Sequence, residues 1–149
     1  MSEAETLLAY WQEHREQLRQ SENQRSVLTN YVLIIVAALG GFIAQQDFTL
    51  ATIPLSLLIV AVGFYGALTV AKYHERAEYH LSQARALTRT LVAVGALSDY
   101  RPALDKAREH HYGKYKRLHR VRLHVLWTSM HLAVSAYGAT LVVIAWARA

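Results

Sequence analysis

The sequence predicts an all-α integral membrane protein, in which three transmembrane helices are extended by a cytoplasmic three-helix stalk. Three long runs carry no Asp, Glu, Lys or Arg: residues 26–44, 53–71 and 123–146. At about 1.5 Å per residue, the shortest of these runs reaches about 28 Å, close to the hydrocarbon thickness of about 30 Å. A soluble helical bundle is the alternative, but its buried helices are usually shorter and do not come in threes.

The distribution of Lys and Arg predicts the orientation. Three of them precede the first run, none lies between the first and second, twelve lie in residues 72–122, and only Arg148 follows the third. Because cytoplasmic flanks are enriched in Lys and Arg, we expect the N-terminus and residues 72–122 to be cytoplasmic. The turn at residues 45–52 and the C-terminus are then outside. The absence of cysteine agrees with a reducing compartment.

Residues 2–25 are expected to form a cytoplasmic amphipathic helix. Ser2 and Glu5 have the spacing of a capping box, in which each residue satisfies a backbone N–H of the other. Apolar and aromatic residues then recur at helical spacing, namely Leu7, Leu8, Trp11, His14 and Leu18. No Pro or Gly interrupts the chain before Gly40, so this helix should continue into the first span.

Small residues recur at intervals of three and four in the first two spans. In membranes, such residues let helix backbones approach closely, within one protein or between copies. Pro54 stands at the start of the second span, where its missing N–H costs nothing. The predicted helix-packing residues are Ala37, Gly40, Gly41, Ala44, Gly63, Ala67 and Ala71.

Residues 72–122 are expected to form a cytoplasmic helical hairpin within a single helical domain, residues 1–149. The helical pattern of the second span continues to about residues 95–97, and Ser98, Asp99 and Pro102 then indicate a turn and a new helix. That helix should run over residues 100–122 into the third span, with Gly113 as its weak point. The three cytoplasmic pieces have similar lengths, which favours a three-helix stalk.

No catalytic motif is present, so the sequence predicts neither an enzyme nor a bound cofactor. The acidic residues fall on solvated helix faces or in turns, and no Ser/His/Asp arrangement is apparent. Eight histidines suggest a metal site, but His74 and His80 are six residues apart, and His119 and His124 are five apart. Neither pair has the i, i+4 spacing that places two imidazoles on one metal, so no metal site is predicted.

His131 is a possible intramembrane polar site, because it lies inside the third span, where ionisable residues face the protein interior or water. The simpler interpretation is a neutral imidazole that is hydrogen-bonded to a neighbouring helix, with Asn30 or a hydroxyl as its partner. The alternative is a pore-lining or pH-sensing group.

A run of cations without an intervening acid precedes the third span, and it is predicted to bind lipid headgroups or phosphate: Lys114, Lys116, Arg117, Arg120 and Arg122. The alternative ligand is a signalling nucleotide, with Tyr112 and Tyr115 to stack on its base. Nucleic acid is not expected, because five acids offset the twelve cations of residues 72–122.

The layout resembles the small bacterial SLATT-type membrane proteins over roughly residues 15–95. The resemblance rests on QSENQR before the first span, a tight external turn, a second span and then YHERAEYHLSQARAL. The third span departs from the two that are usual in this family. The resemblance implies a bacterial inner-membrane protein that oligomerises and perturbs the membrane in anti-phage defence.

The predicted function is therefore a membrane-perturbing or pore-forming effector that acts as a homo-oligomer in the lipid bilayer. The alternative is a non-enzymatic membrane anchor or scaffold, whose cytoplasmic stalk binds a soluble protein. A nucleotide signal is the other partner that the family resemblance and the cationic run suggest.

Overall fold

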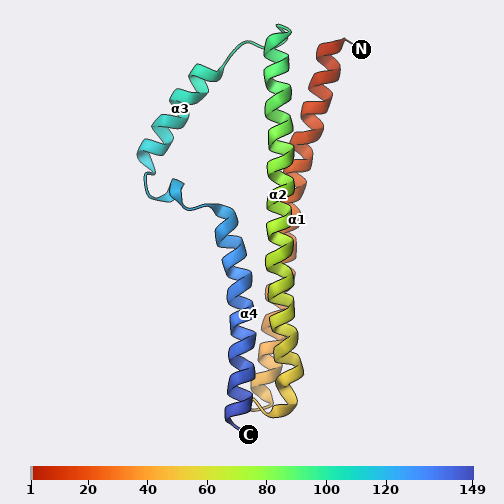
Figure 1. The fold of residues 1–149 in the computed structure, drawn as a ribbon, viewed down its shortest axis with the longest axis vertical. Helices are drawn as coiled ribbons and strands as arrows, with labels where there is room; N and C mark the ends of the chain where they lie inside the picture. Colours follow the sequence, from red (N-terminus) through yellow and green to blue (C-terminus); the bar gives the residue numbers. More distant parts are fainter. Residues whose placement is uncertain (1) are drawn as a thin grey trace. The chain divides into compact units, whose positions relative to one another are not determined.

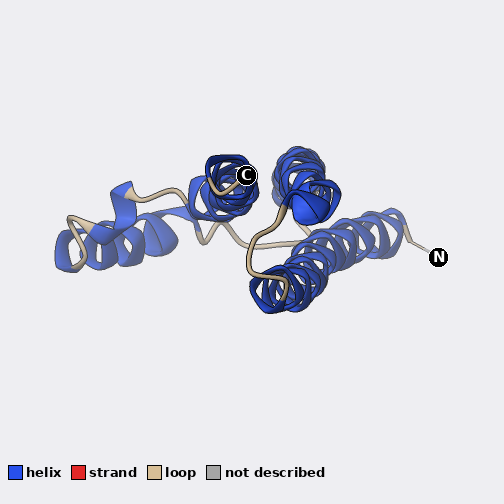
Figure 2. Cartoon of the chain, turned by 90° about the horizontal axis from the view of Figure 1, so that it is seen from below, coloured by secondary structure: helices blue, strands red, loops and turns tan. Residues whose placement is uncertain are grey.

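The computed structural model describes residues 2–149, in which helices are joined by turns and loops and no strand is present (Figures 1 and 2). Its elements, in chain order, are α1 (Glu3–Gln45), η1 (Leu50–Thr52), α2 (Ile53–Ala93), α3 (Arg101–Lys114), η2 (Leu118–Arg120) and α4 (Leu123–Ala147). By length and composition, α1, α4 and the segment Leu50–Ala93, which contains α2, could each cross a membrane. The all-helical prediction is confirmed, together with its three long apolar helices.

The predicted capping box begins α1. The Ser2 backbone N–H donates to the Glu5 carboxylate at 2.7 Å, and the Glu5 N–H donates to the Ser2 hydroxyl at 3.2 Å. From Glu3 the helix runs for 43 residues without a break. The amphipathic segment and the first apolar run therefore belong to one helix, as predicted.

The turn between α1 and α2 adopts an unusual backbone conformation. Asp47 and Phe48 both have positive φ angles, 52° and 56°, in the left-handed region that residues other than glycine rarely adopt. Arg148 donates to the Asp47 carbonyl at 3.3 Å, and its guanidinium carbon lies 5.1 Å from the centre of the Phe48 ring. The end of the chain thus supports this turn.

The end of α2 and the start of α3 agree with the sequence prediction. Gly95 follows α2 with φ +71°, and the N–H of Ala96 donates to the Leu91 carbonyl at 3.0 Å, which closes the last turn. Asp99 then accepts the Arg101 backbone N–H at 3.0 Å, and Pro102 occupies the first turn of α3.

The contacts divide the chain into two compact units, although the sequence analysis treated it as one domain. The polar unit comprises the residues up to Glu22 together with His74–Arg122. The apolar unit comprises Asn23–Tyr73 and Leu123–Ala149.

Three helices build the core of the apolar unit. Its buried aliphatic residues recur at steps of four and seven on α1 and of seven on α4, which places one face of each of these helices inside. They are Val32, Val36 and Ile43 from α1, Ile59 from α2, and Val134 and Leu141 from α4.

In the polar unit, α1 pairs with α2 through a seven-residue repeat. Ala77, Ala84 and Leu91 are buried at heptad spacing on α2, and His14 and Leu18 are half-buried on α1. This repeat is typical of coiled-coil packing, and the small residues bring the two helices close together.

The third helix of the expected stalk is not packed in the structure. None of the α3 residues is buried, and the helix predicted over residues 100–122 ends at Lys114. Two features explain this end: Gly113 is a poor helix former, and the following cations would repel one another at helical spacing. The predicted three-helix stalk is therefore corrected to a pair, α1 with α2, and an exposed α3.

Candidate functional site

A buried hydrogen bond joins α1 to α4 inside the apolar unit. The Thr29 hydroxyl lies 3.1 Å from Nε2 of His131, whose side chain is fully buried. The same hydroxyl donates its proton to the Arg25 carbonyl at 2.9 Å, so it can only accept from His131. The imidazole proton of His131 is therefore on Nε2. The polar partner of His131 is thus a hydroxyl, which was one of the two predicted possibilities.

Asn30, the other predicted partner, is exposed. Each residue of an α-helix is turned by about 100° from the one before, so Thr29 faces α4 and its neighbour Asn30 does not. Of the two partners that the sequence analysis left open, the structure therefore has the hydroxyl, that of Thr29, and not Asn30.

Two glycines of α2 make room for this histidine and for the backbone of α4. A Cβ atom on Gly66 would lie 2.2 Å from Nδ1 of His131, and one on Gly63 would lie 2.6 Å from the backbone N of Ser135. The Ser135 hydroxyl donates to the Val60 carbonyl at 2.9 Å across this contact. The sequence analysis named Gly63 but missed Gly66, although a spacing of three places both on one helix face.

The other predicted helix-packing positions divide into two groups. Gly40 is buried, and a Cβ there would lie 2.7 Å from the Tyr137 hydroxyl oxygen; Ala67 is also buried. A Cβ on Gly41, in contrast, would meet no atom within 4 Å. The exposed group, which makes no close packing within the chain, is Ala37, Gly41, Ala44 and Ala71.

One turn before Thr29, Arg25 lies against Trp127. Arg25 is only 7% exposed, and its guanidinium carbon is 5.4 Å from the centre of the indole ring. Nε of Arg25 and Nε1 of Trp127 are both buried without a hydrogen-bond partner. The sequence analysis used Arg25 only to predict orientation and did not foresee this pair.

In the polar unit, three side-chain contacts join α1 to α2. The Trp11 indole N–H donates to the Thr88 hydroxyl at 3.0 Å. The Nδ1 atoms of His14 and His80 are 3.0 Å apart, so one of them donates a hydrogen bond and the other accepts it. The third contact is a hydrogen bond at 3.0 Å from Arg76 to Gln17.

The environment of His80 favours its neutral form. Partial burial lowers the pKa of His80, and the nearby charges of His14 and Arg76 lower it further, whereas Glu13 acts in the opposite direction. Across residues 2–149, no group of three or more His, Cys, Asp or Glu side chains is placed to hold a metal ion.

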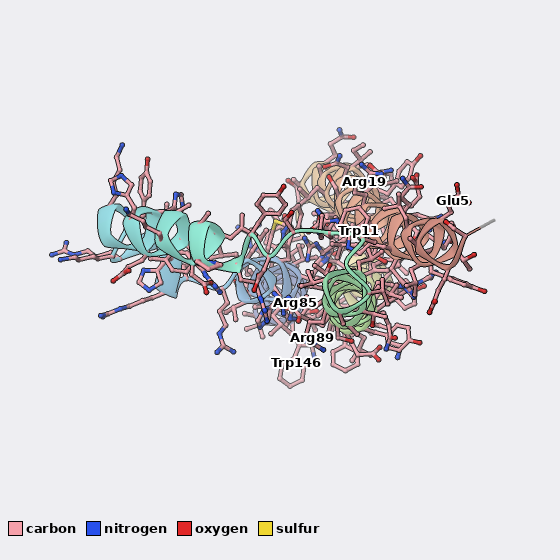
Figure 3. All side chains as sticks on the ribbon, turned by 90° about the horizontal axis from the view of Figure 1, so that it is seen from above. Glu5, Trp11, Arg19, Arg85, Arg89 and Trp146 are labelled. Atoms are coloured by element: carbon pink, nitrogen blue, oxygen red, sulfur yellow. The ribbon has the colours of Figure 1, made fainter. Side chains whose placement is uncertain are left out.

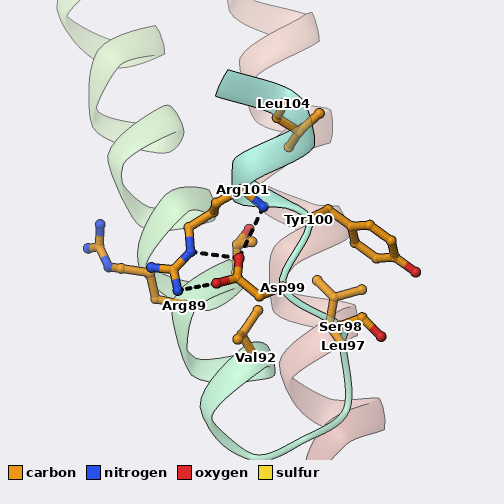
Figure 4. Close-up of a pocket in the computed structure, with 9 residues that line it drawn as sticks. Arg89, Val92, Leu97, Ser98, Asp99, Tyr100, Arg101 and Leu104 are labelled. Carbon is orange, nitrogen blue, oxygen red and sulfur yellow. Dashed lines mark hydrogen bonds and ion pairs between the residues drawn. The ribbon is translucent and has the colours of Figure 1, made fainter. Parts of the chain in front are cut away.

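Two pockets lie at the end of the polar unit. The larger is an apolar groove of about 490 Å³ between α1 and the end of α2, lined by Leu8, Trp11, Leu91 and Leu97 among others; Figure 3 labels Trp11. The smaller, of about 180 Å³, lies where α2 meets the turn to α3. Asp99 is hydrogen-bonded to Arg101 there (Figure 4), and these bonds lower the pKa of Asp99 to about 2.

The five cations that were predicted to bind lipid or phosphate are exposed, and they extend over the end of α3, η2 and the residues beside η2. The neighbouring tyrosines contact histidines. The ring of Tyr112 stacks on His119 with centres 5.0 Å apart, and Tyr115 lies 4.9 Å from His111. Lys114 lies over the Tyr115 ring at 5.6 Å.

Comparisons with protein-family models, with curated proteins and with solved structures give no match. The resemblance to SLATT-type proteins therefore stays a prediction.

Proposed function

We propose that this protein is a multi-pass membrane protein that self-associates and permeabilises a bacterial inner membrane. The three long apolar helices support the membrane location. The positions of the Lys and Arg residues support a cytoplasmic N-terminus and an outside C-terminus.

The observation that carries the proposal of self-association is the exposed row of small residues on α1. Ala37, Gly41 and Ala44 are exposed, and a side chain on Gly41 would meet nothing within 4 Å. In a bilayer, close approach of backbones along such a row is the main attraction between helices, because lipid chains supply no hydrophobic drive. A second copy of α1 fits this row.

Light scattering of the detergent-purified protein, together with dye release from liposomes, tests this proposal. We expect a defined oligomer that releases dye, and we expect Gly41→Leu to reduce both properties. Ala61→Leu, at an exposed position of α2, is the matched control and should leave both unchanged. A monomer that leaves liposomes sealed would overturn the proposal.

One observation favours a second candidate, a membrane anchor that binds a soluble protein. The apolar groove of the polar unit exposes Leu8 and Leu97, of which 45% and 38% are accessible. An amphipathic helix of a partner would cover such a groove. Depolarisation of cells on expression, with or without a trigger, separates the candidates: the effector causes it, and the anchor does not.

A further inference from the structure

Arg25 is a buried cation without an anionic partner among residues 2–149. It is only 7% exposed, and its guanidinium makes a cation–π contact with the ring of Trp127. Burying a charge is costly unless an opposite charge or hydrogen bonds compensate it. A cation–π contact offsets only part of the cost of burying an ion.

The free hydrogen-bonding atoms of this pair are both donors. Nε of Arg25 and Nε1 of Trp127 are buried and lack acceptors. Guanidinium and indole N–H groups donate only, so a ligand that satisfies them supplies acceptor oxygens. A water molecule would accept hydrogen bonds but would leave the charge of Arg25 uncompensated, whereas a phosphate supplies both oxygens and charge.

A second Arg–Trp pair, in the polar unit, provides an internal comparison. The guanidinium of Arg15 lies 5.8 Å from the Trp11 ring, at a distance similar to that of the buried pair. Arg15 is exposed, and the Trp11 N–H already donates to Thr88. The exposed pair therefore needs no ligand, and only the buried pair has unsatisfied donors.

The position of Arg25 favours one source of phosphate. Arg25 immediately precedes the uncharged run 26–44, so in the proposed orientation it lies at the cytoplasmic headgroup layer. One turn deeper, the bond between Thr29 and His131 joins α1 to α4 and holds Arg25 beside Trp127. Tryptophan is itself enriched at this depth of the bilayer.

We propose that Arg25 and Trp127 bind the phosphate of an anionic phospholipid headgroup in the cytoplasmic leaflet. This site rests on the membrane insertion and orientation given under the proposed function, but it requires neither self-association nor pore formation. Both donor atoms are shielded from solvent, so binding requires the two side chains to separate. The guanidinium then supplies the positive charge and the Nε donor, and the indole supplies the second donor.

Native mass spectrometry tests the site on the full chain, released from nanodiscs of phosphatidylcholine with or without phosphatidylglycerol. We expect wild type to retain one phosphatidylglycerol and little phosphatidylcholine. Arg25→Gln should reduce this retention at least about tenfold, since hydrogen bonds to charged groups contribute about 1.5–3 kcal/mol. Trp127→Phe, which keeps an aromatic ring but removes the N–H, should reduce it about fivefold.

Two controls make the test specific. Arg15→Gln removes the exposed member of the second Arg–Trp pair and should retain lipid as wild type does. Arg25→Lys keeps the charge but loses the Nε donor, so it should fall between wild type and Arg25→Gln. Because Trp127→Phe and Arg25→Lys are conservative, they carry the test if Arg25→Gln fails to fold.

Three results would overturn the inference. The first is equal retention of phosphatidylglycerol by Arg25→Gln and Arg15→Gln. The second is equal retention of the two lipids by wild type. The third is displacement of the lipid by millimolar inorganic phosphate, which would indicate a site for free phosphate. Lipid retention by a protein that leaves liposomes sealed would refute the effector and support the lipid site. Extraction of the protein from membranes by carbonate would refute both proposals.

Discussion

The polar unit and the apolar unit both contain parts of α1 and α2, but they join these helices by different means. In the apolar unit the contacts are aliphatic side chains and glycines that let backbones meet, as at Gly63 and Gly66. In the polar unit the contacts are buried residues at heptad spacing on α2, such as Ala84 and Leu91, together with side-chain hydrogen bonds of partly exposed residues, such as Trp11 with Thr88 and His14 with His80.

The difference follows from the solvent proposed for each unit. Lipid gives helices no hydrophobic reason to associate, so attraction comes from close packing and from a few buried hydrogen bonds. In water, apolar burial drives the pairing, and partly exposed polar groups can exchange hydrogen bonds with solvent. We therefore expect substitutions to cost more in the apolar unit than in the polar unit.

The largest effect is expected at Gly66. Gly66→Ala would place a Cβ atom 2.2 Å from Nδ1 of the buried His131, which forces α2 and α4 apart. Overpacking of this kind costs about 1–3 kcal/mol, and the loss should appear as a lower thermal midpoint in detergent. Gly113→Ala, on the exposed α3, is the control: nothing lies within 4 Å, and the better helix propensity of alanine should keep or raise the midpoint. Equal midpoints for the two variants would contradict the packing described at Gly66.

Thr29→Val should have the next largest effect. The substitution keeps the shape of Thr29 but leaves the Nε2–H of His131 without an acceptor. Hydrogen bonds between membrane helices contribute about 0.6 kcal/mol on average and up to about 1.7 kcal/mol. A double-mutant cycle with His131→Leu measures the coupling, and Asn30→Ala at the exposed neighbouring position is the control. A coupling energy of zero would show that the bond does not stabilise the protein.

Acid should loosen the pairing of α1 with α2 at His14 and His80. Because the pKa of His80 is lowered in the folded pair, the separated helices bind the proton more readily. The stability from this pair is therefore complete above the ordinary value of 6.5 and is lost as the pH falls through the lowered pKa. The protection of the amides of residues 77–84, that is, their exchange rate relative to the intrinsic rate at the same pH, should fall between pH 7 and pH 5 in wild type.

The same exchange experiment on His80→Gln supplies the comparison, because glutamine does not titrate in this range. Glu13, Arg76 and His14 remain in that variant, so any loosening that persists would come from those groups. His110→Gln, on the exposed α3, should behave as wild type does. An identical pH response in wild type and His80→Gln would refute the role of the histidine pair.

The smallest effect is expected at Asp99, which is exposed. Asp99→Asn should accelerate amide exchange in the first turn of α3 without changing the thermal midpoint, since the hydrogen bond from the Arg101 N–H to the Asp99 carboxylate is local. In wild type the pKa of Asp99 is lowered to about 2, from an ordinary value of 3.8. The contribution of Asp99 to the stability of the first turn of α3 is therefore complete above pH 3.8 and is lost as the pH falls toward 2. Protection of α3 that is already lost at pH 5 would contradict this.

The sequence by itself determined the helices, because helical periodicity, capping and helix-ending residues are properties of neighbours along the chain. The Ser2–Glu5 box starts α1, Gly95 follows the end of α2, and the three apolar runs lie within α1, α2 and α4. The prediction that α3 continues as a helix to residue 122 was wrong, because α3 ends at Lys114. That prediction considered only the spacing of apolar residues and not the repulsion among the cations of residues 114–122.

Only the tertiary structure decided which faces meet. Periodicity shows that Thr29, Gly66 and His131 each lie on a helix face, but it does not give the rotation and register of one helix against another. A rotation of about 100° would have exchanged Thr29 for Asn30. For the same reason the sequence did not predict the pairing of His14 with His80 or of Arg25 with Trp127, whose members are 66 and 102 residues apart. Side-chain fit across the interface selects one register from several that the pattern allows.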